Sequence, residues 1–150
     1  MTKFLLALHV IAAIVAVGPV TVAASMFPPA ARRALDAPDD TGAAGTVRLL
    51  HRICRVYAAV GVAVPVFGFA TASAMGVMGD PWLITSIALT TLAAVVLVVL
   101  VLPGQEVFVE GGGGTRAATA RLGMFTGVFN LLWATVTVLM IVRPGSTTGA

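Results

Sequence analysis

Charged residues are scarce in this sequence, and their scarcity excludes most classes of soluble protein. They make up 10% of the 150 residues, whereas hydrophobic residues make up 59%. Soluble domains have about 25% charged and about 45–50% apolar residues. A soluble domain of this size could not bury so much apolar surface, because small domains hide only about two-thirds of what their unfolded chain exposes. The composition therefore indicates a membrane protein.

Residues that could carry out catalysis are also few. Cysteine occurs once, as Cys54, so the chain can form no intramolecular disulfide and no paired-cysteine metal site. No aspartate, glutamate, lysine or arginine lies deep in an apolar run, which argues against ion-coupled transport by a single copy of the chain. By the same test, the apolar runs contain no carboxylate pair, no nucleophile beside a base and no cluster of metal ligands. We therefore expect no enzymatic activity, no bound metal and no other cofactor.

Four apolar runs dominate what is there, at about residues 4–26, 53–78, 82–102 and 122–142. Each has about 20 residues or more, the length that a helix needs to cross a hydrocarbon core of ~30 Å. Long apolar runs without alternation indicate helices rather than barrel strands. We predict one all-α domain over residues 1–150, an antiparallel bundle of four transmembrane helices that end at the glycines and prolines after positions 26, 78, 102 and 142.

The first and third connections are predicted to be loops. Residues 28–46 mix alanine, proline, glycine and aspartate, which suits a solvated linker with a short helix at residues 30–35. Residues 104–120 contain four consecutive glycines at 111–114. The lysine and hydroxyl of a phosphate-binding loop do not follow them at the required spacing. This stretch is therefore interpreted as a flexible connector.

The arginines orient the chain. Seven of them flank the first and third connections, whereas the opposite side carries only Lys3 and Arg143. Because cytoplasmic loops are enriched in basic residues, we expect both termini outside the cell. Eight arginines against one lysine, with abundant alanine, valine and glycine, favour a bacterial plasma membrane. The alternative, a cleaved signal peptide at the first run, would export five arginines beside a membrane span.

His9 is the first candidate for intramembrane chemistry. On a helix it shares a face with Ala12, Ala13 and Ala16, and small residues mark where membrane helices pack closely. An ionisable group inside a membrane suggests a functional site, so a ligand or proton role is one hypothesis. The other is a structural histidine bonded to a hydroxyl of a neighbouring helix. Candidate hydroxyls at a similar depth belong to Thr71, Ser73, Thr85, Ser86 and Thr137.

Depth argues against a haem held between His9 and His51 within one chain. The first helix places His9 near the outer side, whereas His51 begins the second helix at the inner side. The two would lie roughly 20–25 Å apart, too far to share one iron. A haem paired through His9 across a dimer stays an alternative.

A basic ridge precedes the second apolar run. Arg48, Arg52 and Arg55 are spaced i, i+4 and i+7, so they share one helical face. At a cytoplasmic interface they would attract anionic lipid headgroups, each by about 1 kcal/mol. They could also only set topology, with their side chains extended to the membrane surface. We interpret Cys54, in the same turn, as a small buried residue rather than a reactive thiol.

The fourth run contains a helix-packing motif. Gly123, Gly127, Asn130 and Ala134 recur on one face, and Gly-x-x-x-Gly lets two backbones approach closely. Asn130 lies near mid-membrane and needs a hydrogen-bond partner, for which the threonines at positions 90 and 91 lie at a matching depth. We favour packing of this face within the chain over packing in a homodimer.

Prolines lie inside two of the runs. Pro19 leaves the carbonyl of Val15 without its usual donor, and Pro65 does the same for Gly61. Prolines at such positions kink membrane helices and are tolerated where neighbouring groups repair the backbone bonds. We therefore expect kinks in the first and second helices.

The opening run resembles a known family. The pattern LLxLHVIAA at residues 5–13, followed by Gly18, is similar to the first helix of the bacterial four-helix family called domain of unknown function 2269. More distantly, it is similar to the membrane domain of copper-resistance D-type proteins. The resemblance implies a four-helix fold and a membrane location, and no activity. Pro19 stands where those helices often continue Gly-Gly, and no methionine- or histidine-rich motif occurs at the outer face, so we expect no copper site.

These observations favour a non-enzymatic plasma-membrane protein, an accessory or scaffolding subunit of a larger membrane complex. Expected partners are the bilayer, anionic headgroups at the cytoplasmic face, and a second copy or other membrane proteins. The pI near 10 reflects arginines beside membrane spans rather than nucleic-acid binding. The alternative is a haem- or metal-binding or proton-relay redox protein that uses His9. A third class, a small-molecule transporter or channel, would need a water-filled cavity at mid-membrane.

Overall fold

The computed structural model describes residues 1–111 and 113–146, and these residues are helical along most of their length. Four helical segments are long and apolar enough to cross a membrane, and no strand occurs within the described ranges. This confirms the predicted all-α, four-helix, multi-pass membrane fold. The elements are α1 (Thr2–Asp36), α2 (Thr41–Val60), α3 (Ala63–Met75), α4 (Pro81–Val95), the π-helix η1 (Val96–Val101), α5 (Leu102–Val109) and α6 (Arg116–Val142).

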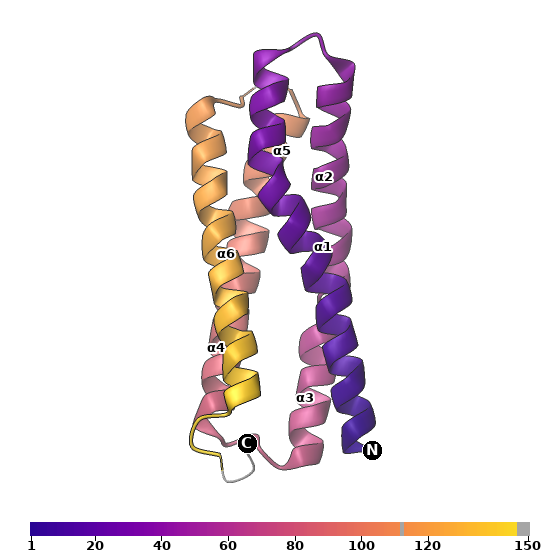
Figure 1. Ribbon diagram of the computed structural model, residues 1–150, viewed down its shortest axis with the longest axis vertical. Helices are drawn as coiled ribbons and strands as arrows, with labels where there is room; N and C mark the ends of the chain where they lie inside the picture. Colours follow the sequence, from indigo (N-terminus) through magenta and orange to yellow (C-terminus); the bar gives the residue numbers. More distant parts are fainter. Residues whose placement is uncertain (112, 147–150) are drawn as a thin grey trace.

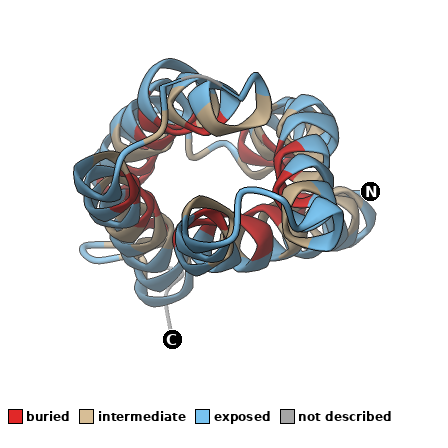
Figure 2. Cartoon of the chain, turned by 90° about the horizontal axis from the view of Figure 1, so that it is seen from above, coloured by how far each residue is buried: buried red, intermediate tan, exposed pale blue. Residues whose placement is uncertain are grey.

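The four segments run antiparallel, with α2 and α3 forming one interrupted helix and α4, η1 and α5 another (Figure 1). The start of α1, the α3–α4 connection and the end of α6 lie at one end of the bundle. The α1–α2 and α5–α6 connections lie at the other, which we call the arginine-rich end. Seen along the bundle, buried residues face inward and exposed residues face outward on all four segments (Figure 2).

The main core lies where α1, α2, η1 and α6 meet. Phe27 is fully buried there, and its ring packs edge-on against that of Phe108, with the ring centroids 6.0 Å apart. A smaller cluster at the opposite end contains Ala72, Trp82 and Leu83. The outward apolar side chains are exposed, as expected for surfaces that face lipid.

α1 corrects the expected end of the first helix. It continues ten residues beyond position 26, through Pro28 and Pro29, to Asp36. A proline inside a helix costs about 3 kcal/mol. Phe27 and Ala31, on either side of the pair, are fully buried, so packing offsets that cost. The helix bends instead of stopping (Figure 1), and the short helix expected at residues 30–35 is part of it.

The second helix also starts earlier than expected, at Thr41 rather than near position 53. The Asp40 carboxylate caps it by accepting hydrogen bonds from the backbone N–H groups of Gly42 (2.9 Å) and Ala43 (3.2 Å). The helix is interrupted between Val60 and Ala63, close to the kink predicted at Pro65. Because Pro65 has no N–H, the carbonyl of Gly61 accepts instead from the N–H of Val64 at 3.1 Å.

The third helix continues through Pro103 to Val109, although residues 104–120 were predicted to be a connector. The π-helix η1 lies directly ahead of the proline, and the N–H of Leu102 bonds the carbonyl of Leu97, five residues back. Such wide turns occur where a regular ladder loses a donor. The connection between α5 and α6 is limited to residues 110–115, of which Gly112 lies outside the described residues.

The helices are longer than a membrane is thick. α1 has 35 residues, or about 52 Å at 1.5 Å per residue, against a hydrocarbon core of ~30 Å. The apolar run at residues 4–26 accounts for about 34 Å of that length. The rest of α1, like the first half of α2, carries arginines. The predicted spans therefore match the apolar part of each helix, and the helices continue past it at the arginine-rich end.

Candidate functional site

A buried polar cluster joins α2 to α5 towards the arginine-rich end. Gln105 is fully buried, with its Oε1 atom 3.0 Å from Nδ1 of His51 and its Nε2 atom 3.6 Å from Sγ of Cys54. His51 and Cys54 are buried too, because residues 47, 50, 51 and 54 form the inward face of α2. The cluster therefore places an amide, an imidazole and a thiol together inside the bundle.

The chemistry of the groups in this cluster identifies the donor and the acceptor of each hydrogen bond. The carbonyl oxygen of Gln105 can only accept, so Nδ1 of His51 carries a proton and donates it to this bond. The amide nitrogen of Gln105 donates to the sulfur of Cys54. No group of three or more histidine, cysteine, aspartate or glutamate side chains that could hold a metal occurs within residues 1–111 and 113–146. The cluster works as a polar clamp between two helices.

Sequence reasoning missed Gln105 because it placed this residue in a connector. A signal was present: Val101, Gln105 and Phe108 follow i, i+4 and i+7 spacing and continue the helical face through Pro103. Val101 and Gln105 are both fully buried, and Phe108 contacts Phe27. At this position the helical spacing of these residues indicates the structure better than Pro103 does.

His9 makes a second interhelical clamp, towards the opposite end. Its ring is buried, and Nδ1 lies 2.9 Å from the carbonyl oxygen of Val64 in α3. Because a carbonyl only accepts, Nδ1 carries a proton and donates it to this bond. The ring rests on Gly68, where an added Cβ atom would lie 3.0 Å from Cε1 of His9. The glycine thus provides the space that the imidazole occupies.

The predicted hydroxyl partner of His9 is wrong. The candidate hydroxyls with a recorded bond donate to carbonyls four residues earlier in their own helix, the usual bond for a helical serine or threonine. These pairs are Thr71 to Phe67 (2.7 Å), Thr85 to Pro81 (2.8 Å), Ser86 to Trp82 (2.8 Å) and Thr137 to Trp133 (2.9 Å). The inward alanine face is present, with Ala16 buried and Ala12 and Ala13 half-buried.

The two histidines lie at different levels. His9 contacts Val64, which is 13 positions (64 minus 51) after His51 along the second helix. At 1.5 Å per residue this is about 20 Å. His51 bonds Gln105 instead. The arrangement agrees with the sequence argument against a haem held by this pair within one chain.

The basic ridge faces outward. Arg48, Arg52 and Arg55 are exposed, and none of them has an ion pair or hydrogen bond to the described residues. They lie beside the buried face of α2 and share one side of the helix. Binding of anionic headgroups there stays a prediction.

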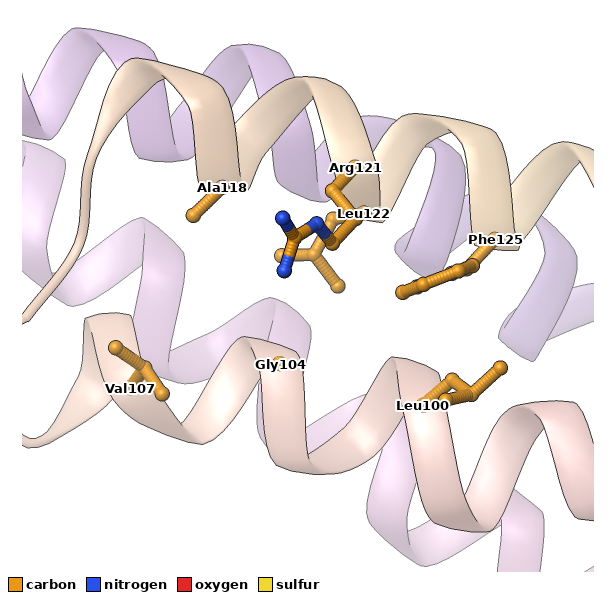
Figure 3. A pocket seen from close by; sticks show the side chains of 7 residues that line it. All are labelled: Leu100, Gly104, Val107, Ala118, Arg121, Leu122 and Phe125. Atoms are coloured by element: carbon orange, nitrogen blue, oxygen red, sulfur yellow. The ribbon is translucent and has the colours of Figure 1, made fainter.

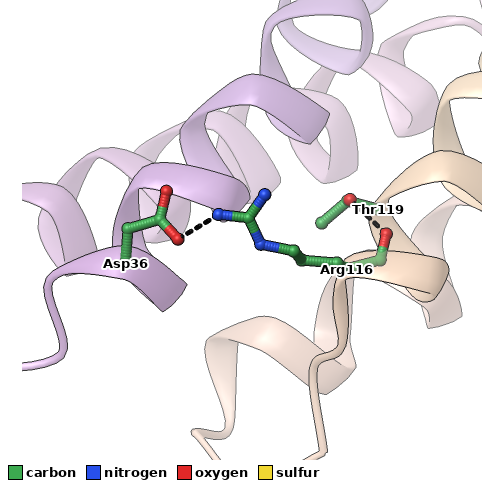
Figure 4. A network of polar contacts seen from close by, with 3 residues as sticks. All are labelled: Asp36, Arg116 and Thr119. Carbon is green, nitrogen blue, oxygen red and sulfur yellow. Dashed lines mark hydrogen bonds and ion pairs between the residues drawn. The ribbon is translucent and has the colours of Figure 1, made fainter.

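A surface ion pair connects α1 to α6 (Figure 4). Nη2 of Arg116 lies 2.5 Å from Oδ1 of Asp36, and the hydroxyl of Thr119 donates to the Arg116 carbonyl at 2.6 Å. The side chains of Arg116 and Asp36 are 71% and 57% exposed. Exposed pairs of this kind contribute about 0–1 kcal/mol, so this contact positions the helix ends more than it stabilises them.

The glycine face of α6 makes fewer contacts within the chain than the sequence predicts. A Cβ atom added at Gly127 would meet nothing within 4 Å, and one at Gly123 would meet only Cγ of Pro28, at 3.9 Å. Ala134 is exposed. Within the described residues, this face therefore meets α1 near Gly123 and leaves Gly127 without a close neighbour, and packing of the whole face within the chain stays a prediction.

Asn130 finds a partner on α1 rather than on the third helix. Its Nδ2 atom lies 3.2 Å from Oγ of Ser25, whereas the hydroxyl of Thr91 bonds the carbonyl of Ile87. Oδ1 of Asn130 is buried and has no hydrogen-bond partner among the residues that the structure describes. The expected pairing with a threonine at position 90 or 91 is not made.

Comparisons with protein-family models, with curated proteins and with solved structures found no match to this chain. The resemblance of residues 5–13 to domain of unknown function 2269 therefore stays a prediction. Two histidines join helices inside the bundle. Gly127, with open space at its Cβ position, and exposed arginines lie on its surface.

Proposed function

We propose that this chain is a non-catalytic subunit of a larger membrane assembly, and that α6 packs against a transmembrane helix of a partner protein. The observation that carries this proposal is the uncovered face of α6. A Cβ atom added at Gly127 would meet no described atom within 4 Å, one at Gly123 would reach only Cγ of Pro28 at 3.9 Å, and Ala134 on the same face is exposed.

The physics of helix association in lipid supports this use of the face. Lipid tails are as apolar as leucine, so membrane helices associate through close packing at small residues and not through the hydrophobic effect. A glycine inside a helix costs about 1 kcal/mol relative to alanine. Gly127, which no described helix of this chain approaches closely, is therefore best explained by a helix from outside the chain. Met124 and Leu131, 60% and 70% exposed, border one side of the face and would pack against the partner helix.

The arginine distribution supports a place for the subunit in a bacterial plasma membrane, with both termini outside the cytoplasm. Arg32, Arg33, Arg48, Arg52, Arg55, Arg116 and Arg121 flank the connections at one end of the bundle. The opposite end carries Lys3 and Arg143. Basic residues in short connections remain preferentially on the cytoplasmic side. A reporter fused to the C-terminus should therefore be inactive if it requires the cytoplasm.

The assembly is tested by blocking the face. Native mass spectrometry of the tagged chain, extracted from its own membrane with surrounding lipid, should show a complex heavier than the 15.3 kDa chain. Gly127→Leu should release the partner. Ala88→Leu, which adds the same bulk at an exposed position of α4, should retain it. A chain that is monomeric in its native membrane, or a complex that Gly127→Leu leaves intact, would refute the proposal. A complex of two copies would identify the partner as a second chain.

One observation favours a second candidate, a ligand-binding role for His9. Its Nδ1–H bonds a backbone carbonyl, which leaves Nε2 as the lone-pair nitrogen. Metal-ligating histidines are commonly oriented in this way. An absorption spectrum and a metal analysis of purified protein decide this: a haem band or stoichiometric metal that is lost in His9→Ala supports it. A colourless, metal-free protein leaves the subunit role alone.

A further inference from the structure

A groove on the membrane-facing surface lies between the third helix and α6, and it is separate from the glycine face. Its volume is about 180 Å³. Leu100, Gly104 and Val107 form one wall, and Ala118, Leu122 and Phe125 form the other. Arg121 is the charged residue among those that line it (Figure 3). We propose that this groove binds one anionic phospholipid, with an acyl chain along its apolar walls and the phosphate at Arg121.

The groove exists because small residues line its walls. A Cβ atom added at Gly104 would lie 2.8 Å from Cδ2 of Leu122, so the glycine lets the leucine lie against α5 without a shift. On the opposite wall, the small side chain of Ala118 leaves space in the groove. Leu100 belongs to η1, whose wide turn precedes Gly104. The hollow is thus built into both helices.

The charge of Arg121 is available to a ligand. Among the described residues Arg121 has no ion pair or hydrogen bond, unlike Arg116 one turn earlier, which bonds Asp36. Figure 3 shows its guanidinium extending from α6 towards the space between the two helices. An arginine fork suits a phosphate group, because its N–H donors match two phosphate oxygens.

The depth of each group matches the order of groups in a phospholipid. Arg121 directly precedes the apolar run that begins at Leu122, so it lies at the boundary between hydrocarbon and headgroups. Phe125 lies one turn further along α6, or about 6 Å deeper. Charge at the boundary and apolar walls below it favour an anionic lipid over a soluble anion, which would make no use of the walls.

The proposal is tested by lipid titration of the full chain in detergent, followed by native mass spectrometry. The probes are phosphatidylglycerol and phosphatidylcholine with identical acyl chains. We expect one phosphatidylglycerol to bind more tightly than phosphatidylcholine. Arg121→Gln should weaken phosphatidylglycerol binding about fivefold, the contribution of one arginine at a membrane surface. Ala118→Leu, which fills the groove, should weaken the binding of both lipids.

Arg32→Gln is the matched control, because it removes the same charge from an exposed position of α1. Circular dichroism establishes that each variant is folded before binding is compared. Equal losses in Arg121→Gln and Arg32→Gln would show general attraction to anionic lipid and overturn the proposal. Unchanged binding in Ala118→Leu would overturn the groove as the site. Neither result depends on the partner helix at α6, since Gly127 lies outside this groove.

Discussion

The clamp at Gln105 permits a direct test of how the bundle is held together. Gln105→Leu keeps a side chain of similar size but removes both polar groups. Oε1 no longer accepts from Nδ1 of His51, and Nε2 no longer donates to Cys54. Because His51 is 6% exposed, water does not readily replace the lost acceptor. We therefore expect the variant to fold into the same bundle with a lower unfolding temperature.

The expected loss in unfolding free energy follows from the burial of the group that is left unpaired. Leaving a buried donor unpaired costs about 1–3 kcal/mol, and interhelical hydrogen bonds in membrane proteins average about 0.6 kcal/mol with a maximum near 1.7. The two ranges describe the same loss, and their overlap lies at about 1–2 kcal/mol. For a chain of this length each kcal/mol shifts the midpoint by about 2–4 °C. The expected decrease is therefore roughly 2–8 °C.

The assay is thermal unfolding in detergent, followed by tryptophan fluorescence and circular dichroism. Glu106→Gln, at the exposed neighbouring position, is the control and should leave the midpoint unchanged. The double variant His51→Leu with Gln105→Leu removes both partners, which is nearly neutral when shape is kept. It should recover part of the loss. An unchanged midpoint in Gln105→Leu, or a double variant whose loss equals the sum of the single losses, would refute the clamp.

Two further predictions concern the other buried polar groups. Gly68→Leu should displace the ring of His9, which lies 3.0 Å from the position of an added Cβ atom. It should therefore lower the unfolding midpoint more in the wild type than in His9→Ala. Equal losses in both backgrounds would contradict the contact. Asn130→Leu removes one hydrogen bond of 3.2 Å to Ser25 but also removes a buried carbonyl oxygen that has no partner. Because an unpaired buried group costs about 1–3 kcal/mol, the midpoint should stay the same or rise, and a decrease of several degrees would show that Oδ1 is bonded.

The membrane helices could be predicted because their signal is long and local. Runs of about 20 apolar residues determine the number of spans whatever their packing. The inward face of α1 was also readable, since Ala12, Ala13 and Ala16 share the side of His9. The interruption near Pro65 followed from a missing donor at one known carbonyl, that of Gly61. Each of these predictions depends on neighbours in the sequence.

The helix ends could not be predicted because they depend on contacts between distant residues. Pro28 and Pro29 would normally end a helix, but Phe27 and Ala31 are buried against other segments and hold it. Gln105 was assigned to a connector for the same reason, since Pro103 precedes it. Partners of polar groups are the least local property. His9 bonds a backbone carbonyl, and no sequence pattern identifies one carbonyl among many.

The placement of polar groups connects these observations to the proposed role. Both histidines use Nδ1–H in the same way, His9 to hold α1 against α3 and His51 to hold α2 against α5, about 20 Å apart along the bundle. These two bonds use the Nδ1 atoms of both rings to join helices. On the outer surface, by contrast, Gly127 has open space around it and Arg121 carries a charge with no ion pair or hydrogen bond within the described ranges. Hydrogen bonds hold the helices together inside the bundle, whereas groups on its surface are available to a ligand. This arrangement suits a protein that acts through what it binds at its membrane-facing surface.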